Sequence, residues 1–112
     1  MKYILLVLLL NSLISKTSYA QSKDAKLIVG KWISESDTKS VIVFDKTTEY
    51  EYYNNELDFT FSYEIRNDSL ITIEKSGKLS VFYYSIENLD KDFLSLTYLK
   101  WGNMLIYRRA KK

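Results

Sequence analysis

Between Leu57 and Arg66 the chain alternates strictly between apolar and polar residues. The apolar positions are Leu57, Phe59, Phe61, Tyr63 and Ile65. Successive side chains of a strand point to opposite faces, so this period predicts a strand with one face on a core and the other in water. A helix would scatter the same side chains around its circumference, so the pattern argues against an amphipathic helix.

Further apolar or alternating runs, separated by turn-forming residues, predict seven more strands. They span residues 27–34, 40–44, 48–53, 69–75, 78–88, 93–99 and 104–109. The chain contains no proline and shows no helical period beyond its first residues. Short strands joined in sequence by tight turns predict an all-β fold, an eight-stranded antiparallel up-and-down meander barrel. The interior of such a barrel holds either side chains or one small ligand.

The pair Asn54-Asn55 is typical of a two-residue hairpin turn and predicts the register of the strands around it. This register places Tyr52 opposite Leu57. It places Tyr50 opposite Phe59, so both tyrosines are expected on the inner face.

The same register places four acidic residues on the outer face. Glu51 lies opposite Asp58, with Glu49 and Glu56 nearby, and facing like charges are mildly destabilising. We interpret this patch as a solvated surface. A Ca²⁺ site is the less favoured alternative, because such sites need six to eight converging oxygens.

Two runs, 70–73 and 81–84, are apolar at consecutive positions and so on both faces. The alternation therefore leaves their facing open. We expect one side to be covered by a neighbouring loop, by the leading segment or by a partner chain.

The first twenty residues are typical of a cleavable signal peptide. Lys2 precedes an apolar run, and Ser18-Tyr19-Ala20 is a small-x-small cleavage site. A membrane anchor would need about 20 apolar residues, whereas polar residues interrupt this run from Asn11 onward. We therefore predict a signal peptide over 1–20 and a single barrel domain over 21–112.

The composition predicts a soluble exported protein, periplasmic or secreted, with no membrane span once the signal is removed. The absence of cysteine rules out disulfides and a lipidated cysteine anchor. Removing residues 1–20 takes away Lys2 and Lys16 and leaves 14 basic and 14 acidic groups. This balance gives no reason to expect a nucleic-acid partner.

The chain also lacks histidine, which with the missing cysteine excludes most catalytic arrangements. An ordinary zinc site is excluded for the same reason. A carboxylate pair for glycoside hydrolysis is conceivable, but the acids are predicted to face water. We therefore expect no enzyme activity, no cofactor and no metal.

Tyrosine is unusually frequent, with ten in the chain. Phenols and phenylalanine rings that line a barrel interior can present hydroxyls and flat apolar walls to a small molecule. The candidate ligand-binding residues are Tyr50, Tyr52, Phe59, Phe61 and Tyr63. The competing interpretation is that these rings fill the core or sit on exposed strand positions.

Two segments resemble the lipocalin family. Gly30-Lys31-Trp32 on the first strand resembles its Gly-x-Trp signature, and Tyr107-Arg108-Arg109 resembles its closing segment. The resemblance covers Leu27 to Arg109 and is closest to short lipocalin-like domains exported by bacteria. It implies that Trp32 plugs one end of the barrel beside Gly30. It also implies that Arg108 or Arg109 lies across the indole as a cation, and alternation does not decide between them.

Typical lipocalins are longer, with a wide calyx and a helix after the barrel, and no helix is predicted after this one. The family contains carriers, inhibitors and structural modules. From the sequence we therefore predict a small-molecule binding protein for an apolar or amphipathic ligand. The alternative is a protein-interaction or inhibitor module with a filled barrel, contacting its partner through Tyr53, Tyr83 or Trp101.

Overall fold

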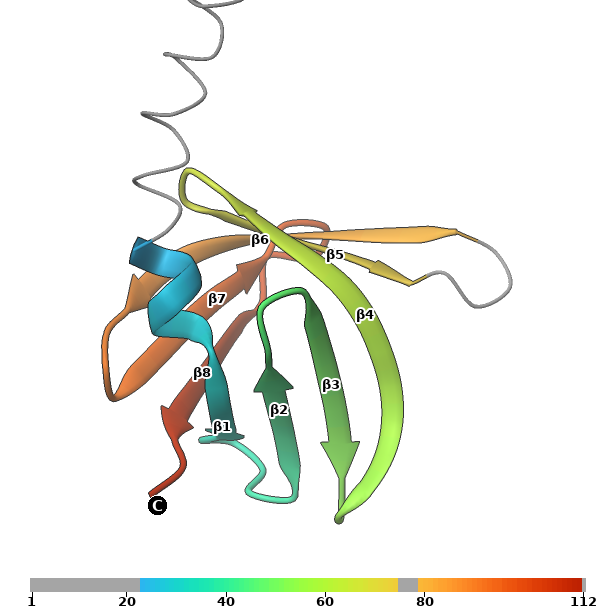
Figure 1. The fold of residues 1–112 in the computed structure, drawn as a ribbon, viewed down its shortest axis with the longest axis vertical. Helices are drawn as coiled ribbons and strands as arrows, with labels where there is room; N and C mark the ends of the chain where they lie inside the picture. The colour runs from blue at the N-terminus through green and yellow to red at the C-terminus, as the bar shows by residue number, and fades with distance from the viewer. Residues whose placement is uncertain (1–22, 75–78, 112) are drawn as a thin grey trace, which may run out of the picture.

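The computed structural model describes residues 23–74 and 79–111. Its strands are β1 Gly30–Ser34, β2 Ser40–Phe44, β3 Thr48–Tyr53, β4 Glu56–Arg66, β5 Ser69–Glu74, β6 Ser80–Leu89, β7 Phe93–Tyr98 and β8 Met104–Arg109. Each strand pairs antiparallel with the next, and β1 pairs with β8 to close the barrel (Figure 1). The predicted eight-stranded up-and-down barrel is confirmed. The predicted signal peptide, residues 1–20, lies outside the described residues.

Asparagine residues make the hairpin turns that the sequence predicted. Asn54 and Asn55 have φ values of 52° and 69°, and Asn67 has a φ of 53°. Asparagine tolerates this left-handed region better than most residues because its short polar side chain bonds locally to the backbone.

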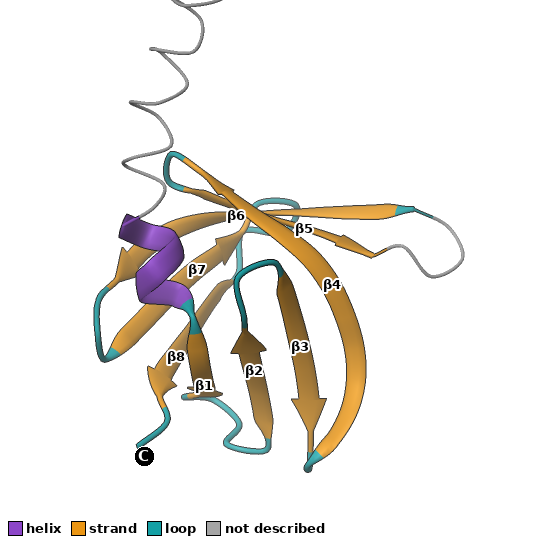
Figure 2. Cartoon of the chain, in the orientation of Figure 1, coloured by secondary structure: helices purple, strands orange, loops and turns teal. Residues whose placement is uncertain are grey.

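The chain enters the barrel through a short helix, so the prediction of a strand from Leu27 onward is wrong at its start. Residues 23–28 are helical and lead into β1 at one end of the barrel (Figure 2). Ile28 is fully buried in the core. Gly30, at φ 136°, turns the chain from helix to strand in a conformation that side-chain-bearing residues rarely adopt. No helix among the described residues is long and apolar enough to cross a membrane.

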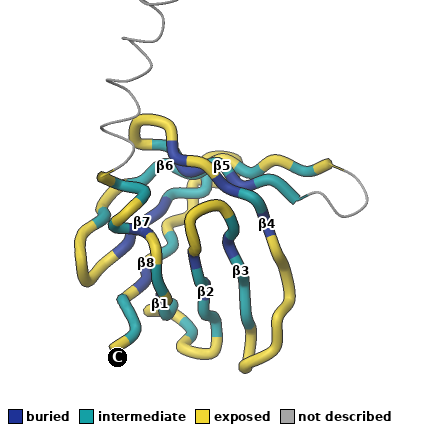
Figure 3. The backbone as a smooth tube through the Cα atoms, viewed as in Figure 1, coloured by how far each residue is buried: buried dark blue, intermediate teal, exposed yellow. Residues whose placement is uncertain are grey.

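The core occupies the half of the barrel next to this helix. Its largest members are Trp32, Phe44, Leu70 and Leu94. Along β4 the positions from Phe61 onward alternate between buried and outward-facing residues, whereas the first half of the strand is exposed (Figure 3). The dry face predicted for this strand is therefore confirmed only for its second half.

A β-bulge in the β3–β4 hairpin overturns the predicted register. Tyr52 pairs with Leu57 as predicted, but Glu51, not Tyr50, pairs with Phe59. Asp58 is the extra residue, because it has no partner on β3. All of β3, Tyr52 included, therefore faces the opposite side from that predicted, and Leu57 faces outward with Tyr52.

The bulge therefore places the glutamates of β3, and not its tyrosines, on the inner face. Glu49 pairs with Phe44 on β2 and with Phe61 on β4, both of which are core residues. Glu49 therefore faces the interior. Tyr50, the next residue, faces outward, and its hydroxyl lies 3.4 Å from Asp45 Oδ2.

The structure also shows which residues of the runs 70–73 and 81–84 face the interior of the barrel. Leu70 pairs with Tyr84, and Thr72 pairs with Phe82, on the inner face. On the outer face Val81 is exposed, and so is Tyr83. Within the described residues nothing covers that part of the outer surface.

Candidate ligand-binding site in the barrel

The helix end of the barrel is held by an indole with a guanidinium over it. Trp32 is fully buried, and its Nε1 donates to the carbonyl of Ile28 at 2.8 Å. The guanidinium carbon of Arg109 lies 4.1 Å from the centre of the indole. A Cβ on Gly30 would lie 2.5 Å from Arg109 Nη1, so glycine is needed for this close approach.

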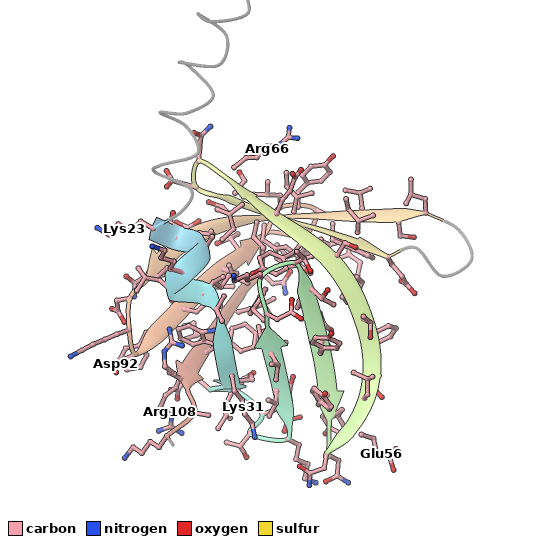
Figure 4. The ribbon with its side chains drawn as sticks, viewed as in Figure 1. Lys23, Lys31, Glu56, Arg66, Asp92 and Arg108 are labelled. Atoms are coloured by element: carbon pink, nitrogen blue, oxygen red, sulfur yellow. The ribbon has the colours of Figure 1, made fainter. Side chains whose placement is uncertain are left out.

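Arg109, not Arg108, is therefore the arginine that lies over the indole. Its guanidinium also donates to the backbone carbonyls of Leu27, Val29 and Lys91. Arg108 is exposed near the end of β8 (Figure 4), and its Nε lies 3.7 Å from Glu35 Oε1.

Two carboxyl groups that we predicted on the outer face belong to the inner face of β3. They are those of Glu49 and Glu51, here called the acid pair. Glu49 is only 5% exposed, and its Oε2 is buried with no hydrogen-bond partner in the described part of the chain. Burial raises the pKa of the Glu49 carboxyl well above its usual range, and a hydrogen bond with Glu51 and the charge of Glu51 raise it further. A buried carboxyl with a like-charged neighbour is costly to ionise.

The charge of Glu49 acts on three tyrosine phenols, those of Tyr63, Tyr84 and Tyr107. Burial raises the pKa of Tyr63 to about 12, and the charges of Asp45 and Glu49 contribute. Burial also raises the pKa of Tyr84 and of Tyr107, and in both cases the charges of Glu49 and Glu51 raise it further. All three phenols therefore stay protonated at neutral pH and can donate hydrogen bonds.

The raised pKa makes the stability of the fold depend on pH. The unfolded Glu49 carboxyl ionises near 4.5, whereas the folded one keeps its proton to higher pH. As pH rises through this window, the free energy of unfolding should fall by about 1.4 kcal/mol per pH unit. We expect Glu49→Gln to remove this fall, measured by urea unfolding across pH.

The matched control is Glu87→Gln, at an exposed position of β6. It should give the wild-type pH dependence. Parallel stability curves for the wild type and Glu49→Gln would show that Glu49 is not buried in the barrel.

A row of aromatic rings runs from β4 across β6 to the β7–β8 turn. The ring centres of Phe59 and Phe61 are 6.0 Å apart, and Phe61 makes an edge contact with Phe82 at 5.8 Å. Tyr98 lies 6.4 Å from Phe82 and 5.4 Å from Trp101. The row reaches solvent at both ends, because Phe59 is 50% and Trp101 75% exposed.

A hollow of about 440 Å³ lies at the Phe59 end of this row. Its lining residues are Thr48, Asp58, Phe59, Thr60, Phe61, Ser62, Ile73 and Glu74. These residues place it in the angle between the first half of β4 and the end of β5. Figure 1 shows that β4 and the β5–β6 hairpin separate there. Another hollow, of about 480 Å³, lies beside the helix and is lined by Ala25, Lys26, Val29 and Lys46.

The structure brings together only part of the predicted ligand-binding set. Phe59, Phe61 and Tyr63 are on the inner face, while Tyr50 and Tyr52 are on the outer face. Tyr52 instead lines an outer hollow of about 290 Å³. The residues that the sequence reasoning missed are Glu49, Glu51, Thr72, Phe82, Tyr84, Tyr98 and Tyr107.

Among the described residues no group of three or more acidic, histidine or cysteine side chains is placed to hold a metal ion.

Comparison with protein families, curated proteins and solved structures found no match. The resemblance of Gly30-Lys31-Trp32 to the lipocalin signature therefore stays a prediction.

Proposed function

We propose that this protein is an exported lipocalin-like barrel that binds a small apolar or amphipathic molecule in the hollow beside Phe59 and Phe61. The observation that carries the proposal is this hollow of about 440 Å³, with two inner-face phenylalanines in its wall. Ligand pockets usually have volumes of about 300–1,000 Å³. The apolar part of the lining of this hollow consists of Phe59, Phe61 and Ile73, and its other five lining residues are polar.

The lipocalin-like part of the proposal rests on the helix end of the barrel. Trp32 lies fully buried on β1, next to Gly30, with the guanidinium of Arg109 over its ring. This is the arrangement that the resemblance implied. The export part rests on the signal-like pattern of residues 1–20.

A neutral fluorescent probe, N-phenyl-1-naphthylamine, tests the binding proposal. We expect its fluorescence to rise on binding, and Phe59→Ser to weaken binding by about tenfold, because the ring supplies buried apolar area. The matched control is Phe93→Ser, because Phe93 is also a half-exposed phenylalanine on a strand. No binding, or equal weakening by both variants, would contradict the proposal.

A second candidate function is protein interaction through the outer surface. Exposed apolar side chains on and around β6 and the β7–β8 turn include Leu79, Val81, Tyr83, Leu99, Trp101 and Met104. Part of this surface is a hollow of about 350 Å³ lined by Val81, Tyr83 and Leu99, among others. Exposed apolar patches of this kind are typical of interaction sites.

The same probe separates the two candidates. If it binds at the outer surface, Tyr83→Ser should weaken its binding and Phe59→Ser should not. The proposed function predicts the reverse.

A further inference from the structure

The hollow and the acid pair share one wall of the barrel. Phe61 pairs directly with Glu49, and Phe59 pairs directly with Glu51. Residues opposite each other in an antiparallel pair lie on the same face, with Cβ atoms about 5 Å apart. The two rings that line the hollow are therefore the immediate neighbours of the two carboxyls.

Among the described residues the acid pair has no cationic partner, because neither Glu49 nor Glu51 forms an ion pair within residues 23–74 and 79–111. Oε2 of Glu49 is buried without a hydrogen-bond partner in this part of the chain. The inner arginine, Arg109, contacts Trp32 and the carbonyls at the helix end of the barrel. A buried carboxylate of this kind is stabilised by a positively charged hydrogen-bond donor.

We propose that the ligand of this barrel is an amphipathic primary amine. Its apolar part lies in the hollow against Phe59 and Phe61, and its ammonium group binds between Glu49 and Glu51. This inference rests on the proposed function and adds the charge of the ligand.

The chemistry of the wall fits an ammonium better than other head groups. An ammonium has three hydrogen-bond donors and no acceptor, which matches carboxylate oxygens. The faces of the neighbouring aromatic rings also attract organic cations. A carboxylate ligand would be repelled by the acid pair, and an alcohol would not neutralise it.

Isothermal titration with three eight-carbon probes tests the inference. Octylamine, octanol and octanoate have the same chain and differ in the head group. At neutral pH we expect octylamine to bind at least about tenfold more tightly than octanol, and octanoate to bind most weakly. Glu49→Gln and Glu51→Gln should bring the affinity for octylamine down to that for octanol.

Glu87→Gln is the matched control and should leave all three affinities unchanged. Circular dichroism of each variant separates loss of binding from loss of folding, because both glutamine variants keep the shape of the side chain. Equal binding of octylamine and octanol, or octylamine binding that survives both glutamine substitutions, would overturn the inference and keep the proposed function. Binding of none of the probes, N-phenyl-1-naphthylamine included, would overturn both.

Discussion

Replacing Trp32 with alanine is expected to lower the free energy of unfolding by about 3–5 kcal/mol. Trp32 is one of the largest fully buried side chains of the described core, and its Nε1 bonds to Ile28. Its removal leaves a cavity at the helix end and a carbonyl without its donor. A domain of about 90 residues typically has about 5–14 kcal/mol of stability in total. The variant should therefore be close to unfolding, as urea denaturation can measure.

The second tryptophan of the chain provides the control. Trp101 is 75% exposed in the β7–β8 turn, and its ring contacts Tyr98. Trp101→Ala should change the stability by less than about 1 kcal/mol, because surface substitutions usually have small effects. Similar losses for the two variants would mean that Trp32 does not hold the helix end of the barrel.

Replacing Arg109 with alanine should destabilise the protein by about 2–4 kcal/mol. The guanidinium binds the carbonyls of Leu27, Val29 and Lys91 and lies over Trp32. Hydrogen bonds to a charged group contribute about 1.5–3 kcal/mol, and a cation over an indole adds about 0.5–2 kcal/mol. Urea unfolding gives the loss, and faster amide exchange in residues 23–28 should accompany it.

Arg109→Lys should recover little of this stability. An ammonium is a point charge and cannot reproduce the planar donor fork that reaches several carbonyls at once. Arg108→Ala is the control on the neighbouring residue, whose exposed contact with Glu35 is worth at most about 1 kcal/mol. Equal effects of Arg108→Ala and Arg109→Ala would contradict the assignment of Arg109 to the indole.

The sequence predicts the barrel well because its signals are local. Phe61, Tyr63 and Ile65 alternate with polar residues because one face of their strand packs on the core. Asparagine occupies the turns because its backbone accepts positive φ. Closure of the barrel is expected because no other predicted element would cover the two edge strands of an open sheet.

The sequence does not predict the acid pair, because a single bulge reverses the facing of β3. In the run 48–53 tyrosine and glutamate alternate, so either face of the strand is consistent with the period. One signal was available: the ideal hairpin places Glu51 opposite Asp58, and like charges repel. The bulge leaves Asp58 without a partner and places Glu51 opposite Phe59.

The helix before β1 was missed for a different reason. Six helical residues are too few to show a period, and Leu27 and Ile28 are equally typical of a strand. Only tertiary contacts distinguish the two. These are the burial of Ile28, its hydrogen bond with Trp32, and the turn at Gly30.

The most direct test of this account is a pH titration of the glutamate carboxyl carbons by ¹³C NMR, with and without octylamine. We expect the Glu49 carboxyl to titrate well above the ordinary value of 4.5 in the free protein. Octylamine should lower its pKa, because a nearby positive charge favours the ionised form. A Glu49 carboxyl that titrates near 4.5 in the free protein, or that octylamine leaves unchanged, would contradict an acid-lined amine site inside the barrel.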